Sequence, residues 1–225
     1  MKKLIALAAF VIAALPAGAQ QAKYTVKGTD GKNGKTVYVV DLLKKARIDS
    51  VSVANGQFSI TGTADRNALL AIQERGDVWQ TVFFNDGTPI TINMKNHMLE
   101  GSAINRRTNR YALEFKIITE MVNKMGADFG HLTEEQKDEK RNEFIGQAEA
   151  LYNNLRDLCK YILEKNSDNL IPAAFITQVY QLGGDIDFQK AYDSKYVYAR
   201  HPYAVAVKRQ IEEMAQPEEE ADDDE

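Results

Sequence analysis

Residues 48–62 read I-D-S-V-S-V-A-N-G-Q-F-S-I-T-G, and this stretch decides the fold class. It predicts a β-hairpin with a two-residue type I′ turn at Asn55-Gly56, because both central residues of that turn take positive φ. The register puts two apolar pairs on one face of the hairpin: Val53 with Phe58, and Val51 with Ile60. Serine and threonine hydroxyls fall on the other face. We therefore expect a β-rich domain whose core receives the apolar face of this hairpin.

Further short strands separated by glycine turns are predicted on both sides of this stretch. They are expected at residues 24–28, 37–42, 69–73, 78–84, 88–94 and 97–101. The segments 78–84 and 88–94 predict a second hairpin that turns at Asp86-Gly87. Its register would place Phe83 beside Ile90 and Trp79 beside Met94. Such a series is typical of an antiparallel β-sandwich or small barrel, here of about seven to eight strands.

The apolar period changes to that of α-helices after Gly101. Residues 111–125 predict one helix, followed by a loop that contains Gly126 and Gly130. Thr133 and Gln136 form a capping-box pattern at the start of a second helix, whose apolar repeat continues to Ile162. We expect these two helices to form an antiparallel hairpin. Shorter helices are predicted at 172–182, at 185–192 and from Pro202 onward, so the fold class is α+β.

The two ends of the chain predict export and a solvated tail. Residues 1–19 have the form of a secretory signal peptide, with two lysines, a short apolar run and Ala17-Gly18-Ala19 before the expected signal-peptidase cleavage site. No cysteine follows directly, so we expect a periplasmic protein without a lipid anchor or a transmembrane segment. The expected divisions are a signal peptide at 1–19, a β-sandwich domain at 20–102, a helical region at 103–215 and a disordered acidic tail at 216–225.

The charge of the chain is unevenly distributed. The whole sequence has 28 basic and 32 acidic residues. Without Lys2, Lys3 and the seven acids of residues 218–225, 26 basic and 25 acidic residues remain in the body. A body this close to neutral argues against nucleic-acid binding, which needs a concentrated basic surface.

The sequence contains no recognisable catalytic, cofactor-binding or metal-binding motif, so we expect a protein that is not an enzyme and needs no cofactor. His97, His131 and His201 are far apart, and none has a second metal ligand at the usual spacing. The best candidate binding surface is a cluster rich in aromatic residues: Tyr192, Tyr196, Tyr198, Arg200, His201 and Tyr203. Such clusters form partner surfaces, and more often they pack helix ends against a sheet.

Cys159 is the one cysteine of the chain. It lies on the apolar stripe of the second predicted helix, which favours a small buried hydrophobic residue over a reactive thiol. No C-x-x-C pair is present, and no internal disulfide can form.

The segments 48–62, F-F-N-D-G-T-P-I-T-I (83–92) and L-E-G-S (99–102) resemble a β-rich domain of unknown function. That domain is found N-terminal to TlpA-like thioredoxin domains in exported proteins of Bacteroidetes-type bacteria. The resemblance covers residues 24–110 and implies a fold but no catalytic residues. The later helices resemble the segment that leads to the thioredoxin domain in those proteins, and no thioredoxin domain is present in this sequence.

Three functional hypotheses follow. The first is an exported, non-catalytic module that binds another protein or an envelope component. The second is an accessory to a thiol-disulfide system, acting through Cys159 or by docking onto a thioredoxin-like protein. The third is a small-molecule carrier with a cavity between the sandwich and the helices.

Overall fold

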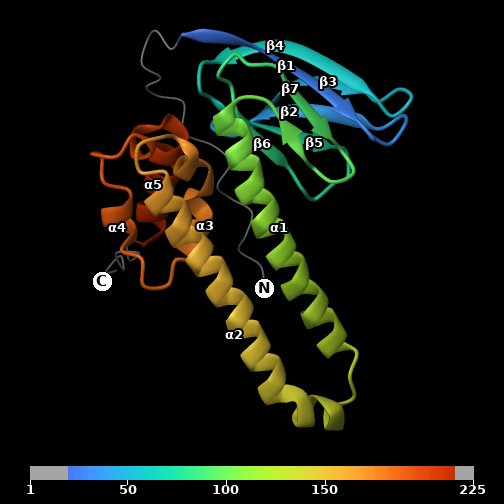
Figure 1. Ribbon diagram of the computed structural model, residues 1–225, viewed down its shortest axis with the longest axis vertical. Helices are drawn as coiled ribbons and strands as arrows, with labels where there is room; N and C mark the ends of the chain where they lie inside the picture. The colour runs from blue at the N-terminus through green and yellow to red at the C-terminus, as the bar shows by residue number, and fades with distance from the viewer. Residues whose placement is uncertain (1–19, 216–225) are drawn as a thin grey trace, which may run out of the picture.

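The computed structural model describes residues 20–215, and contains eight strands followed by helices. The predicted signal peptide and acidic tail lie outside these residues. The strands form two four-stranded sheets that face each other without closing into a barrel, as Figure 1 shows. One sheet has the order β4(Phe58–Asp65), β1(Gln21–Thr29), β7(Ile90–Asn93) and β8(Leu99–Glu100). The other has the order β3(Ala46–Ser52), β2(Thr36–Asp41), β5(Leu69–Glu74) and β6(Thr81–Phe84).

The predicted hairpin at residues 48–62 is correct at its turn and wrong in its strand pairing. Asn55 and Gly56 have φ values of 52° and 73°, and Ala54 pairs with Gln57. Beyond that bridge the strands separate, because β3 pairs with β2 and β4 pairs with β1. Val53 and Phe58 are nevertheless both buried, since they point into the same core from opposite sheets.

The second predicted hairpin differs from the structure in the same way. Gly87 has a φ of 88°, as expected for a turn, but β6 pairs with β5 while β7 pairs with β1. Trp79 lies in the connection between β5 and β6 and not in a strand. The β1–β7 pair is parallel, which the predicted antiparallel arrangement did not include. A strand that crosses to the other sheet after a turn can run parallel to its new neighbour, whereas a hairpin partner cannot.

The core of the sandwich is made by the inward-facing residues of both sheets, and it follows the alternation of the strands. β1 alternates regularly between exposed and buried residues, with Tyr24 and Val26 inside. Phe58 fills the space above Gly28, where a Cβ atom would stand 1.9 Å from the Phe58 ring. This contact explains why a residue without a side chain occupies position 28.

Two long helices follow the sandwich, and Figure 1 shows them side by side as an antiparallel hairpin. They are α1(Ala103–Gly130) and α2(Glu134–Lys165). α2 begins at the capping box of Thr133 and Gln136, as predicted. The predicted loop at Gly126 is wrong, because α1 continues through it to Gly130. One glycine costs a helix about 1 kcal/mol, which the surrounding turns and the packing on α2 outweigh.

Two asparagines of α1 tie the helix to the sandwich. Asn105 accepts a hydrogen bond from the Phe84 N–H at 2.7 Å and donates to the Phe84 carbonyl at 2.9 Å. One turn later, Asn109 accepts from the Leu99 N–H and donates to the His97 carbonyl, both at 2.9 Å. Phe84 and Leu99 lie on β6 and β8, the edge strands of the two sheets. α1 therefore covers both open edges on that side of the sandwich.

Beyond α2 the chain forms a compact group of short helices. These are η1(Ile171–Phe175), α3(Ile176–Leu182), α4(Phe188–Ala191), η2(Tyr198–Arg200) and α5(Pro202–Ala215). Pro172 stands in the first turn of η1, a 3₁₀ turn that precedes α3 in place of one continuous helix. Their apolar residues form a second core with the C-terminal half of α2 and the N-terminal half of α1.

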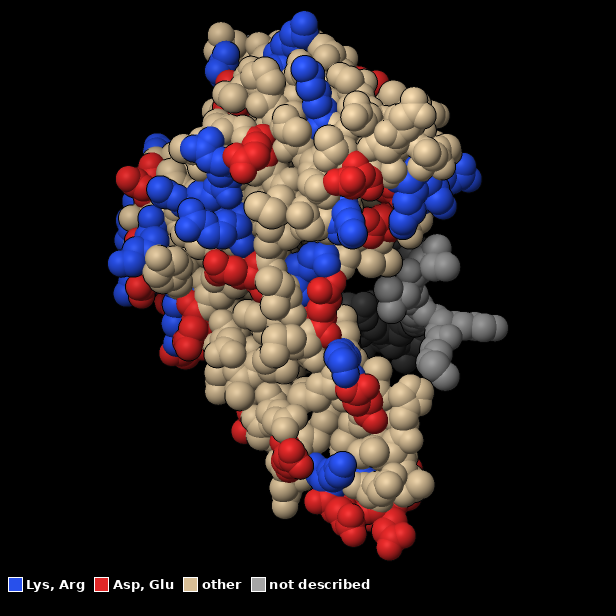
Figure 2. All heavy atoms as spheres, turned by 45° about the vertical axis from the view of Figure 1, so that its right-hand side comes forward, with Lys and Arg blue, Asp and Glu red and all other residues tan. Residues whose placement is uncertain are grey.

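The far halves of α1 and α2 project from the molecule as a two-helix arm, seen at the bottom of Figure 1. No residue between 116 and 154 is buried, since each helix has only the other as a neighbour there. The lower part of Figure 2 shows acidic and basic side chains interspersed along one margin of the arm. The arm also contains ion pairs within one helix, such as Lys124–Asp128 in α1 and Arg141–Asp138 in α2. Among the described residues, no helix has the length and apolar character needed to cross a membrane.

Candidate functional site

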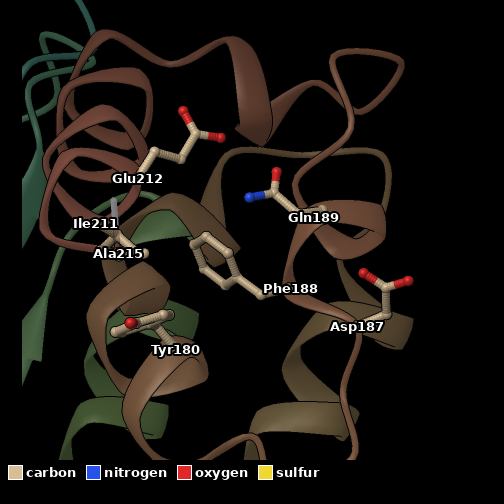
Figure 3. Close-up of a pocket in the computed structure, with 7 residues that line it drawn as sticks. All are labelled: Tyr180, Asp187, Phe188, Gln189, Ile211, Glu212 and Ala215. Atoms are coloured by element: carbon tan, nitrogen blue, oxygen red, sulfur yellow. The ribbon is translucent and has the colours of Figure 1, made fainter. Parts of the chain in front are cut away.

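The candidate site is a groove in the C-terminal helical region, where α3, α4 and α5 meet. Its first part, which we call the Tyr180–Phe188 slot, has a volume of about 400 Å³. Seven residues line the slot: Tyr180 from α3, Asp187, Phe188 and Gln189 from α4 and its N-cap, and Ile211, Glu212 and Ala215 from α5. Figure 3 shows the Phe188 ring projecting between α4 and α5, with the Gln189 amide and the Glu212 carboxylate on the same side of the opening.

A second hollow of about 580 Å³ continues from this slot. The two share Gln189 and Glu212, so together they form one open groove, which we call the α4–α5 groove. The further residues of the second hollow are Tyr192, Asp193, Ser194, Ala199, Val205, Lys208 and Arg209. The second hollow has carboxylates and cations in equal number, whereas the slot has two carboxylates and no cation among its lining residues.

The slot is the surface end of a row of aromatic rings. Tyr196 stacks on Tyr198 with 5.2 Å between ring centroids, and Tyr198 contacts Tyr192 edge to face at 5.4 Å. The row continues from Tyr192 to Phe188 at 5.0 Å and from Phe188 to Tyr180 at 5.3 Å. Tyr192 and Tyr198 are buried, whereas Tyr180 is 44% exposed. The rings inside the core therefore hold the rings of the slot in fixed positions.

The structure brings the predicted aromatic cluster together, but buries three of its six residues: Tyr192, Tyr198 and His201. The hydroxyl of Tyr192 donates to the Pro172 carbonyl at 2.8 Å, and that of Tyr198 donates to the Ala191 carbonyl at 2.7 Å. Burial raises the pKa of both phenols. Tyr196 and Tyr203 are half-buried, and Arg200 is exposed. Of the six predicted binding residues, only Tyr192 lines the α4–α5 groove.

His201 joins the helical region to the sandwich and is 5% exposed. Its Nε2 lies 2.8 Å from the Asn67 carbonyl, and its Nδ1 lies 3.2 Å from the Tyr203 nitrogen. Nε2–H therefore donates to Asn67 while Nδ1 accepts the Tyr203 N–H, which leaves a neutral ring with both nitrogens occupied. Burial lowers the pKa of His201. A ring held in this way has no nitrogen left for a ligand.

Sequence reasoning missed the two residues that form the slot, Tyr180 and Phe188. For Phe188 a signal was available, because it lies four residues before Tyr192 and on the same face of a predicted helix. Tyr180 belongs to the preceding helix, α3, which a turn separates from α4. Only the packing of α3 beside α4 brings its ring to within 5.3 Å of Phe188.

His97 is the histidine whose surroundings most resemble a catalytic site. Its Nδ1 lies 3.5 Å from Thr81 Oγ1, and its Nε2 lies 3.9 Å from an Asp77 carboxylate oxygen. Thr81 is 3% exposed, so its hydroxyl is closed to a substrate. Burial lowers the pKa of His97, with opposing contributions from Asp77 and Lys116. The described residues contain no group of three or more side chains placed to hold a metal ion.

Cys159 is fully buried in the helical core, as its place on the apolar stripe predicted. Burial raises the pKa of its thiol to about 11. A thiol with that pKa is almost entirely protonated at neutral pH, and the thiolate is the reactive form.

Comparison with known families supports the predicted resemblance for the sandwich. Residues 24–108 match the family model described as "Domain of unknown function (DUF4369)". The match covers the sandwich and the first residues of α1, so this part of the chain is similar to domains of that family. The DUF4369 match ends inside α1, after Asn105, whose side chain closes the edge of β6. A search of curated proteins and a search of solved structures both found no match.

Proposed function

We propose that this protein is an exported, non-catalytic binding module of the cell envelope, and that the α4–α5 groove receives a segment of a partner protein. The signal-peptide pattern of residues 1–19 supports export to the periplasm. The sandwich then serves as the rigid body to which α1 attaches the helical region.

The observation that carries this proposal is the row of aromatic rings from Tyr196 to Tyr180. Energetically dominant contacts at protein interfaces centre on aromatic side chains held rigidly beside a pocket. The buried tyrosines fix Phe188 and Tyr180 in place, so little side-chain entropy would be lost when a partner covers them. An exposed tyrosine beside an open groove fits a polypeptide segment better than an enclosed small molecule, which favours a partner protein over the carrier hypothesis.

The thiol-disulfide hypothesis is limited by the burial of Cys159. Direct exchange through this thiol has no support, because the side chain is inaccessible and its pKa is raised to about 11. Docking onto a separate thioredoxin-like protein is compatible with the proposal, since such a protein could be the partner that the groove binds.

Site-specific photocrosslinking in living cells tests the proposed function. A photoreactive amino acid at Gln189 would stand at the mouth of the groove, and the same amino acid at Lys27 would stand on the exposed face of β1. We expect a discrete crosslinked species from position 189 and none of that size from position 27. Crosslinks from position 27 alone, or from neither position, would contradict the groove as the binding surface.

A further inference from the structure

We propose that the Tyr180–Phe188 slot binds the side chain of a lysine or arginine presented by the partner segment. This inference rests on the proposed function and assigns the partner's chemistry. It is carried by the aromatic rings and the carboxylates that line the slot, and by the absence of basic residues from this lining.

The aromatic part of the slot suits a cation with an apolar stem. Tyr180 and Phe188 meet edge to face, with 70° between their ring planes, so the pair does not stack its faces together. Ile211 and Ala215 add aliphatic surface beside them, as Figure 3 shows. A lysine or arginine side chain would lay its methylene groups on this surface and bring its charge within about 6 Å of a ring centroid.

The polar part of the slot suits the same side chain. Asp187 and Glu212 contribute two carboxylates, and none of the seven lining residues is basic. Asp187 uses one oxygen to cap α4, accepting the Lys190 N–H at 3.0 Å. Glu212 forms a long ion pair with Lys208, whose Nζ lies 3.9 Å from Oε1, beyond a normal hydrogen bond. Both carboxylates therefore keep capacity for a cation from outside.

Selection from a random-peptide phage library tests this inference without knowledge of the natural partner. The full mature protein is the bait, and selected peptides are then measured in solution by fluorescence anisotropy. We expect enrichment of peptides in which a lysine or arginine stands beside a large apolar residue. The double variant Asp187→Asn/Glu212→Gln should bind them about tenfold or more weakly. Asparagine keeps the cap on α4, so this variant is expected to fold normally.

The matched control is the double variant Glu139→Gln/Glu149→Gln, which removes the same charge from exposed positions on α2. It should bind like the wild type. Tyr180→Ala should weaken binding. Tyr180→Phe should bind like the wild type, because the ring face and not the hydroxyl contacts the cation. Enriched peptides without basic residues, failure to enrich any peptide, or equal binding by the Asp187→Asn/Glu212→Gln variant and the control would each overturn the inference. A crosslink from position 189 together with such a result would leave the proposed function standing and reject only the basic partner.

Discussion

The amide group of Asn105 makes the two hydrogen bonds with Phe84 that a neighbouring β-strand would otherwise make. Its Oδ1 accepts the Phe84 N–H at 2.7 Å, and its Nδ2 donates to the Phe84 carbonyl at 2.9 Å. Both residues are buried. A helix thus completes the hydrogen bonding of an edge strand through one side chain, and this joins the helical region to the sandwich.

Asn105→Ala should lower the free energy of unfolding by about 2 to 5 kcal/mol, because it leaves a buried N–H and a buried carbonyl without partners. Urea denaturation would measure the change. Asn123→Ala is the control, since Asn123 is exposed on the same helix. An effect of Asn105→Ala below about 1 kcal/mol would show that water replaces the amide at the β6 edge.

Phe58→Ala should cost about 3 to 5 kcal/mol, the usual range for deleting an aromatic side chain from a core. Phe58 is 7% exposed, whereas its neighbour Ser59 points outward. Ser59→Ala should therefore change the stability by less than about 1 kcal/mol. Equal losses in the two variants would mean that the inward and outward faces of β4 are assigned wrongly.

Glycine-to-alanine substitutions should change stability in opposite directions in the arm and in the sandwich. Gly126 and Gly146 lie inside α1 and α2, and a Cβ atom at either position would meet open space. Each change to alanine should stabilise the protein by about 0.5 to 1 kcal/mol. Gly28→Ala should destabilise it, because the added methyl group would overlap the Phe58 ring. Thermal denaturation of the three variants checks the signs, and a stabilising Gly28→Ala would contradict the packing of Phe58.

The stability of the protein should fall as the pH is lowered through about 6.5, the ordinary pKa of histidine. Burial lowers the folded-state pKa of His97 and of His201, so the unfolded chain binds more protons between that lowered pKa and about 6.5. Stability is then fully present above about pH 7 and is lost as the pH falls toward the lowered folded-state pKa values. Protonation of His201 Nδ1 also removes the acceptor of the Tyr203 N–H.

Urea denaturation at about pH 7.5 and about pH 5 measures this loss. His201→Gln should be less stable than the wild type at the higher pH and show a smaller loss between the two. An unchanged pH dependence in both His201→Gln and His97→Asn would reject the assignment to these histidines.

Cys159 should resist a thiol reagent in the folded protein and react once denaturant is added. The side chain is fully buried and its thiol pKa is raised to about 11, so neither access nor thiolate is available. A Tyr152→Cys/Cys159→Ala variant is the matched control, because Tyr152 is 43% exposed on the same helix, and it should react without denaturant. Rapid labelling of Cys159 in the native protein would return direct thiol chemistry to the functional hypotheses.

The predicted binding cluster shows where sequence reasoning stops for the site. Aromatic residues crowded near residue 200 indicated an aromatic assembly, and the assembly exists. The sequence could not tell which rings face inward, because Tyr192 and Tyr198 are buried by helices that come from distant parts of the chain. Tyr180 and Phe188 gained their place at the surface from the same packing.

The sequence by itself determined most of the elements and the two faces of the strands. Side chains alternate across any strand, so Val53 and Phe58 point into the core whichever strands they pair with. The turn at Asn55-Gly56 and the cap at Thr133 were equally local, because they depend on positive φ and on one side-chain hydrogen bond. The tertiary structure decided the pairing: β3 and β4 part after one bridge and join opposite sheets. Backbone hydrogen bonds carry no residue identity, so the choice of partner strand depends on how the whole core packs, and local pattern cannot specify it.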